Sequence, residues 1–314
     1  MEDKKLNPFY SIELFGLKKY FDDFVELFEK NKFPRVLMLS GNKGIGKFTL
    51  IFHLINYILS KSTTDSYNDK KNVINKNNYF YKEILSNICQ NFVYISNDNE
   101  KKISIDNIRD FKKNFNNTIL NKLPRFVVFD DVELLNVYAS NSILKLIEEP
   151  SSSNYFILIN NQKSNIIETI KSRALETKIF LSKDESSKIL DQLIKSKDIN
   201  DHFIHKYNYY STPGMIIKYS ELITNLSIDI NTSFYEIAFL LLDKYKKNKS
   251  PIYLDTLIFF LEIKFQLKNK NSIELIKIIN KKNKLMKLLY DYKKFNLTNN
   301  TVLEYIKISE KSYA

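Results

Sequence analysis

A glycine-rich loop between two apolar segments constrains the fold of this 314-residue chain more than any other feature. Residues 35–40 form a short, mostly apolar run, which is typical of a strand buried inside a parallel sheet. The loop Gly41-Asn42-Lys43-Gly44-Ile45-Gly46-Lys47 follows at once, and residues 48–59 are predicted to form an apolar helix. A strand, a glycine loop, a lysine and a helix in this order are the context of a P-loop. The sequence therefore predicts an α/β fold with a phosphate-binding loop at one edge of its sheet.

The predicted loop supplies four candidate nucleotide-binding residues. Gly41, Gly44 and Gly46 are three of the only five glycines in the chain. Glycines let backbone N–H groups converge on a phosphate, and the N-terminus of the following helix adds a favourable dipole. The ammonium group of Lys47 would then reach the outer phosphates of a nucleotide.

The residue after the P-loop lysine departs from the motif. A serine or threonine at that place ligates Mg²⁺ through its hydroxyl, whereas Phe48 has no ligand atom. Thr49 follows one residue later and is a further candidate nucleotide-binding residue, although it should point to a different side of the helix. The phosphate-binding scaffold is therefore expected to persist without its full magnesium chemistry.

Polar residues follow two further predicted strands. Asp130 and Asp131 come directly after an apolar run at residues 126–129, and Asn160 and Asn161 follow a run at 155–159. Beside a P-loop, Asp130 is a candidate Mg²⁺ ligand through water, and Asp131, one methylene shorter than glutamate, a candidate to orient the attacking water. Asn160, or Asn161, is a candidate sensor of the γ-phosphate. Turn formation and helix capping by the two acids, and chance for the asparagines in so asparagine-rich a chain, are the alternatives.

The basic residues are distributed unevenly between lysine and arginine. The net charge of +12 favours a polyanionic partner, and it fits equally well with genome-wide compositional drift toward Lys, Asn, Ile, Tyr and Phe. Only four of the 48 basic residues are arginines, and a retained arginine indicates a site that needs a planar guanidinium with several donors. The four are Arg35, Arg109, Arg125 and Arg173.

Composition also excludes several classes of protein. The single cysteine, Cys89, rules out a disulfide framework and any Cys-based zinc site within one chain. His53, His202 and His205 lack metal-ligand spacing, so we expect them to be structural and expect no metal site. The first residues carry no signal-peptide core, and no apolar run has the length of a membrane span. We therefore expect a soluble, cytoplasmic protein that does not bind membranes.

Several short motifs occur in a fixed order along residues 14–173 and together resemble one family. Besides the P-loop and Asp130-Asp131, they are Leu14-Phe15-Gly16, residues 103–109, Asn141 with Leu144-Lys145, Glu148-Glu149-Pro150 and residues 169–173. In this combination the chain resembles the AAA+ clamp-loader subunits of bacterial DNA polymerase III, and among them the delta-prime type most. The combination of Glu-Glu-Pro and Ser-Arg at this separation is a much more specific sign of this family than a P-loop alone.

The resemblance implies a three-part architecture and a multi-subunit assembly. The expected parts are an AAA+ domain with a five-stranded parallel sheet at residues 1–181, a small helical lid at 182–225 and an all-α collar at 226–314. The expected assembly is a pentamer that opens a ring-shaped sliding clamp and places it on primed DNA. Its other members would be gamma/tau ATPase subunits and a delta subunit.

The resemblance also implies a role for Arg173. In the family, the arginine of a Ser-Arg-Cys motif acts in trans on the ATP of a neighbouring subunit. Here that arginine is Arg173, and Ala174 stands in place of the cysteine. The guanidinium would neutralise charge on the transferred phosphoryl group, as an arginine finger does. A surface arginine paired with an acid is the structural alternative.

Two departures from the family pattern predict a subunit with little or no ATPase activity of its own. Phe48 replaces the Mg²⁺ ligand, and Met215 stands where a second sensor arginine follows the glycine of Ser211-Thr212-Pro213-Gly214. The pattern is compatible both with a P-loop that still binds ATP or ADP with Mg²⁺ and with one that binds no nucleotide. A gamma/tau-like motor subunit, and a DNA-binding protein with a vestigial P-loop, remain the alternative functions.

Overall fold

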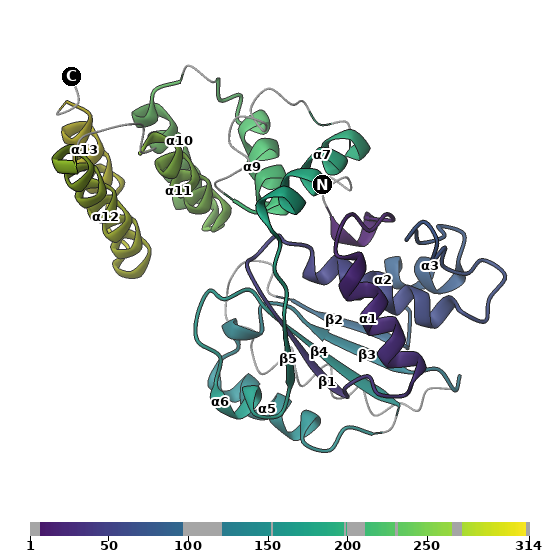
Figure 1. Ribbon diagram of the computed structural model, residues 1–314. Helices are drawn as coiled ribbons and strands as arrows, with labels where there is room; N and C mark the ends of the chain where they lie inside the picture. Colours follow the sequence, from purple (N-terminus) through teal and green to yellow (C-terminus); the bar gives the residue numbers. More distant parts are fainter. Residues whose placement is uncertain are drawn as a thin grey trace. The chain divides into compact units, whose positions relative to one another are not determined.

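The chain divides into two compact units in the computed structural model shown in Figure 1. The first unit comprises Met1–Ile199 together with Thr212–Met215, and the second comprises Asn200–Ser211 together with Ile216–Ala314. The structure describes residues 7–96, 121–151, 153–197, 199, 211–229, 232–265 and 272–311. Several residues of the sequence analysis lie outside the described residues: the motif at 103–109 with Arg109, and His202 and His205. The three domains expected from the sequence, with their boundaries, stay a prediction.

The first unit alternates strands and helices. Its N-terminal half contains η1 (Pro8–Tyr10), α1 (Lys18–Glu29), β1 (Val36–Ser40), α2 (Lys47–Ser60), α3 (Tyr79–Leu85) and β2 (Phe92–Ile95). Its remaining elements are β3 (Arg125–Phe129), η2 (Val132–Leu134), α5 (Val137–Ile147), β4 (Asn154–Asn160), α6 (Glu168–Lys171), β5 (Leu175–Lys178) and α7 (Lys183–Lys197).

The five strands form one parallel sheet in the order β2-β3-β4-β1-β5, which confirms the predicted five-stranded parallel sheet. β1 lies between β4 and β5, with Ser40 opposite Asn160 on one side and Lys178 on the other. Because all strands run the same way, their carboxyl ends share one edge, where ligands bind in open α/β sheets. The P-loop follows β1 at this edge, Asp130 follows β3, and Asn160 is the last residue of β4.

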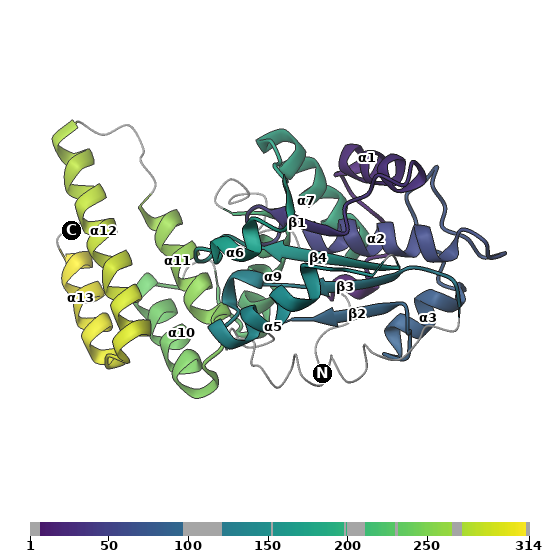
Figure 2. The ribbon, with the colours of Figure 1, turned by 90° about the horizontal axis from the view of Figure 1, so that it is seen from below.

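Helices cover both faces of the sheet. Leu37 and Leu39 of β1 belong to the core that includes side chains of α1 and α2, whereas Val36 and Met38 belong to the core shared with α5 and α6. This alternation follows from the two-residue repeat of a strand. Figures 1 and 2 show the same arrangement, with α1 and α2 on one face and α5 and α6 on the other.

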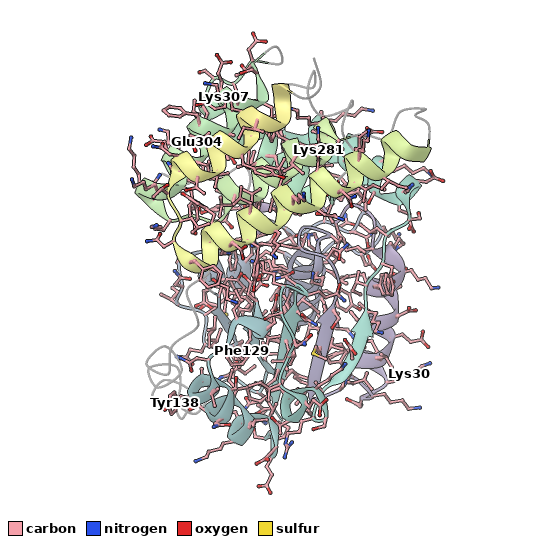
Figure 3. All side chains as sticks on the ribbon, turned by 90° about the vertical axis from the view of Figure 1, so that its left-hand side faces the viewer. Lys30, Phe129, Tyr138, Lys281, Glu304 and Lys307 are labelled. Atoms are coloured by element: carbon pink, nitrogen blue, oxygen red, sulfur yellow. The ribbon has the colours of Figure 1, made fainter. Side chains whose placement is uncertain are left out.

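The contrast between core and surface is visible side chain by side chain. Phe129 at the end of β3 is fully buried and lies among the strands, whereas Tyr138 of α5 and Lys30 lie on the outside of the unit (Figure 3). The continuous apolar run of β3 is therefore explained by helices on both faces of the sheet.

The starts of two helices in the first unit have local causes. Helix α5 begins at Val137, because the side chain of Asn136 caps it by accepting a 2.7 Å hydrogen bond from the Ala139 N–H. Helix α1 begins at Lys18, because Leu17 itself is left-handed, with φ of 54°.

The second unit is helical in its described residues. Helix α9 (Pro213–Asn225) continues into it from the first unit, and α10 (Phe234–Asn248), α11 (Ile252–Lys264), α12 (Ser272–Phe295) and α13 (Asn299–Lys311) follow. Helix α10 packs on α11 and α13, and α12 packs on the same two helices. Among the described residues, no helix is long and apolar enough to cross a membrane.

Candidate functional site

The P-loop has the backbone that its glycines predict. Gly44 and Gly46 have φ angles of 84° and 94°, a region that strongly favours glycine. Gly41 follows β1 directly, and its N–H donates to the Asn160 carbonyl at 3.2 Å. The loop therefore joins the centre of the sheet to the N-terminus of α2, as a phosphate-binding loop does.

Lys47 is turned onto its own loop. Its ammonium group is buried and donates hydrogen bonds to the carbonyls of Gly41 at 2.6 Å and Asn42 at 2.8 Å. Burial lowers the pKa of Lys47 to about 8, against the opposing attraction of Asp130, Glu133 and Asp131. The cation predicted to reach a phosphate is thus held by carbonyl oxygens of the loop.

Phe48 is part of an aromatic cluster beside the P-loop. Its ring centroid lies 4.8 Å from that of Phe9, 4.7 Å from that of Tyr94 and 5.7 Å from that of Phe52. Phe48 is almost fully buried. The position that would carry a Mg²⁺-ligating hydroxyl is therefore filled by a ring packed against other rings. Thr49, the next residue of α2, is half-buried.

The carboxylate of Asp130 has donors from within the protein. The Tyr94 hydroxyl donates to Oδ2 at 3.0 Å, and the Asp131 N–H and the Asn161 amide donate to Oδ1 at 2.9 and 3.1 Å. Burial, followed by the adjacent Asp131 charge, raises the pKa of the Asp130 carboxyl, and these hydrogen bonds oppose the rise.

Position 48 carries a phenyl ring in place of the hydroxyl that a P-loop offers to Mg²⁺, and each oxygen of the Asp130 carboxylate accepts a hydrogen bond within the protein. Within the described part of the chain, no three His, Cys, Asp or Glu side chains gather so that they could hold a metal ion.

Asp131 belongs to a second polar cluster, of which the sequence predicted Asp131 and Asn161. Its Oδ1 accepts from the Asn161 amide at 2.8 Å and lies 3.7 Å from the Lys163 ammonium group. Its left-handed backbone, with φ of 55°, starts η2.

Glu133, which the sequence analysis missed, ties this cluster to the loop after β4. Its two carboxylate oxygens each accept from the Asn161 N–H at 3.1 Å, and burial raises the pKa of this carboxyl. The signal that would have found it is an acid that interrupts the apolar residues 132–135.

The two asparagines at the end of β4 have different partners. Asn160 donates to the Ser40 hydroxyl at 3.1 Å, and Ser40 in turn donates to Glu176. Asn161, the other candidate, is the one that contacts Asp130 and Asp131. The structure thus brings Lys47, Asp130, Asp131 and Asn161 to one edge of the sheet.

The start of α9 lies directly on the P-loop. The Thr212 hydroxyl donates to the Lys43 carbonyl at 2.6 Å, and the Gly214 N–H donates to the Gly44 carbonyl at 2.9 Å. A Cβ on Gly214 would come within 2.7 Å of that carbonyl oxygen, so this approach requires glycine. Met215 follows and is buried.

Arg173 lies two residues after the short helix α6 and is anchored by acceptors of its own chain. Its Nε and Nη2 donate to Oε1 of Glu148 at 3.1 and 2.7 Å. Its Nη1 donates to the Thr169 carbonyl at 3.0 Å and to the Ser172 hydroxyl at 3.4 Å. About a third of its side chain remains exposed.

Four features together define a P-loop protein of the AAA+ class. They are the order of strands in the sheet, the loop after β1, the acids after β3 and the glycine of α9 that lies on that loop. A DNA polymerase III gamma subunit-related protein from Thermotoga maritima has a similar fold. It matches 92% of this chain and 97% of its own with a TM-score of 0.51 and 16% sequence identity.

Sequence comparisons narrow the class to one family. The family model described as DNA polymerase III, delta subunit, matches residues 16–182, more than half of the chain. The delta' subunit of DNA polymerase III from Buchnera aphidicola (subspecies Baizongia pistaciae) is 26% identical over 263 residues, which cover 80% of this chain and 67% of that protein. The delta' subunit from the subspecies Acyrthosiphon pisum is 21% identical over 95% of this chain and 84% of its own length. The chain belongs to the delta-prime family of DNA polymerase III clamp-loader subunits.

A gamma-subunit relative is matched over less of its own length. The gamma subunit of DNA polymerase III from Buchnera aphidicola (subspecies Schizaphis graminum) is 27% identical over 54% of this chain, which spans 44% of that protein.

Proposed function

We propose that this chain is the delta-prime-type subunit of the DNA polymerase III clamp loader, helping to place the sliding clamp on primed DNA during replication in the bacterial cytoplasm. It supplies Arg173 in trans to the ATP of a neighbouring gamma-type subunit, and its own ATP site is degenerate. A delta subunit, the clamp and primed DNA are its further partners through the complex.

The observation that carries the proposal is the contrast between the two sites of the chain. At the P-loop, Phe48 replaces the Mg²⁺ ligand and Lys47 donates to its own loop. At the other site, Arg173 keeps a planar guanidinium on the surface in a chain where lysine replaces almost every other arginine. A chain whose arginine acts on the ATP of a neighbouring subunit needs the Arg173 site and can lose its own P-loop chemistry.

The chemistry of the second site is electrostatic. Negative charge spreads over the transferred phosphoryl group in the transition state, and a guanidinium brought to it from another subunit stabilises that charge. Such a finger contributes roughly 10³–10⁵ in rate at the site it serves. Sites elsewhere in the assembly would be unaffected, so the total ATPase falls only by the share of the site that faces Arg173.

The test is reconstitution of the full chain with its gamma-type and delta subunits, the sliding clamp and primed DNA. Arg173→Ala should assemble like the wild type and lose hydrolysis at the neighbouring ATP site. Lys171→Ala, which removes an exposed cation two residues away, is the matched control and should retain full activity. Full hydrolysis with Arg173→Ala would refute the trans role.

Nucleotide titration of the isolated chain tests the degenerate site separately. We expect no Mg²⁺-dependent tight binding of ATP and no turnover. Brisk hydrolysis by the isolated chain would favour a gamma/tau-like motor subunit instead. Tight binding of primed DNA by the chain alone at physiological salt would favour a DNA-binding protein, because an isolated basic surface gives mainly salt-sensitive affinity.

A further inference from the structure

Two sequence motifs meet at the Arg173 guanidinium. Glu148 follows the last residue of α5, where its N–H donates to the Leu144 carbonyl, and Arg173 follows α6. The side chains are 25 residues apart in sequence, and Oε1 of Glu148 accepts from both Nε and Nη2 of Arg173. The carboxylate therefore holds one edge of the planar guanidinium, while Nη1 is held by the Thr169 carbonyl.

The pair is poorly suited to stabilise the fold. The side chains of Arg173 and Glu148 are 35% and 49% exposed, and ion pairs in such surroundings add little to stability because water screens them. The consequence of the contact is instead geometric. An arginine side chain has many rotamers, and its fork is useful only when its donors point in one direction.

The adjacent acid provides an internal comparison. Glu149 is exposed in the same Glu-Glu-Pro motif, and it makes no hydrogen bond or ion pair with any residue that the structure describes. The two glutamates thus carry the same charge, are adjacent in sequence and are both exposed, but only Glu148 contacts the arginine. Any effect specific to Glu148 can be separated from the loss of one negative charge near the site.

We infer that Glu148 is a positioning residue for the trans-acting arginine: it holds the Nε–Nη2 edge of Arg173 so that the second N–H of Nη2 faces the phosphate of the neighbouring subunit. This inference rests on the proposed function of Arg173. A guanidinium has five N–H donors, and the four hydrogen bonds of Arg173 within its own chain leave that Nη2 N–H, so a carboxylate of one subunit and a phosphate of the next can share the group. The arginine then enters the complex already oriented, which favours the transition state rather than substrate binding.

The kinetic test compares Glu148→Ala, Glu148→Gln and Glu149→Ala in the reconstituted complex with ATP, clamp and primed DNA. Glu148→Ala should lower kcat at the neighbouring site roughly tenfold with little change in KM, because misplacement of a reacting group by about 1 Å can cost up to 10²-fold. Glu148→Gln keeps an acceptor oxygen and should recover part of the loss. Glu149→Ala should match the wild type.

A second measurement does not depend on ATP hydrolysis. The chain has only four arginines, so a ¹⁵N-arginine NMR spectrum contains four Nε–Hε signals, and the Arg173 signal is assigned by its disappearance in Arg173→Ala. In the isolated wild-type chain this signal should show slow exchange with water. It should shift and exchange faster in Glu148→Ala, but not in Glu149→Ala.

The outcomes distinguish failure of the proposed function of Arg173 from failure of the positioning role of Glu148. If Arg173→Ala leaves hydrolysis intact, the proposed function fails, whatever the NMR spectra show. If Arg173→Ala abolishes hydrolysis at the neighbouring site but Glu148→Ala is as active as the wild type, only the positioning role of Glu148 is overturned. Increased hydrolysis in Glu148→Ala would also overturn it, since the carboxylate would then restrain the arginine.

Discussion

The rings of Phe48 and Tyr94 meet edge to face, with centroids 4.7 Å apart and an interplanar angle of 62°. Phe48 follows the P-loop lysine, and the Tyr94 hydroxyl donates to Asp130 after β3. This contact therefore joins the two positions that hold Mg²⁺ in a catalytic P-loop protein.

Phe48→Ser should destabilise the chain without creating an ATPase. Truncating a buried phenyl ring typically costs about 3–5 kcal/mol, and Phe48 packs against three other rings. The restored hydroxyl would still face an Asp130 held by Tyr94 and a Lys47 held by its loop. Urea unfolding measures the loss of stability, and ATP titration with Mg²⁺ measures the site.

The control for this substitution is Phe180→Ser, because the Phe180 side chain is 67% exposed. Its unfolding free energy should stay within about 0.5 kcal/mol of the wild type. Recovery of Mg²⁺-dependent hydrolysis by Phe48→Ser alone would show that the lysine and the acid are free to return to catalytic positions.

Tyr94→Phe should cost about 1–3 kcal/mol of stability, because it removes a donor from a desolvated carboxylate. In an Asp130→Ala background the same change should cost much less, since the acceptor is absent. A double-mutant cycle of unfolding free energies measures this coupling. Equal costs in the two backgrounds would mean that the hydroxyl does not stabilise Asp130.

Gly44→Ala should be more harmful than Gly46→Ala. Both residues have left-handed φ angles, which cost other residues about 1–2 kcal/mol. A Cβ on Gly44 would also lie 2.4 Å from Thr212 Oγ1 and 2.8 Å from the Met215 nitrogen, whereas a Cβ on Gly46 would meet only the Leu17 side chain, at 3.2 Å. The extra overlap should add at least about 1 kcal/mol, measured by urea unfolding. Equal losses would show that the start of α9 does not rest on the P-loop in solution.

His53 should remain neutral well below pH 6. Its ring is buried, with Nδ1 2.9 Å from the Tyr67 hydroxyl and Nε2 3.0 Å from the Ser11 carbonyl, and burial lowers its pKa to about 4. Between pH 6.5 and 4 the unfolded chain therefore binds more protons than the folded one. Stability should fall as the pH drops through this window, by up to about 3 kcal/mol from this group.

The imidazole C–H signals in NMR spectra follow this titration directly. A His53 midpoint near pH 6.5 would contradict the buried, hydrogen-bonded position. His53→Leu should remove its contribution to the acid dependence of the unfolding free energy.

The apolar pattern is sufficient to predict four of the five strands. β1, β3 and β4 are buried on both faces, so nearly every residue in them is apolar, and the apolar run at residues 92–95 likewise predicts β2 at its observed bounds. β5 was not recognised, because Leu175–Lys178 is an edge strand with polar residues and one neighbour. The periodicity of a four-residue edge strand is too weak to separate it from a loop.

The choice between Asn160 and Asn161 shows the same limit at the site. Asn160 is the last residue of β4 and Asn161 is the next, and the sequence pattern favours neither. A shift of one residue along a strand moves a side chain to the opposite face, so the backbone at the end of β4 decides which amide meets Asp130. Glu133 is visible in the sequence as an acid among apolar residues, but its partner is not, since its contact with the Asn161 N–H depends on the loop after β4.

The sequence alone determined the properties that are local: a loop whose glycines permit left-handed backbone, a phenylalanine where a hydroxyl is required, and the order of motifs typical of a clamp-loader subunit. The folded chain was needed to show that Arg173 is held by Glu148, that Tyr94 donates to Asp130 and that α9 begins on the P-loop. Backbone preference and side-chain chemistry belong to each residue by itself. These contacts join residues 25 to 170 positions apart, and only the packing of the strands and helices between them brings such residues within hydrogen-bonding distance.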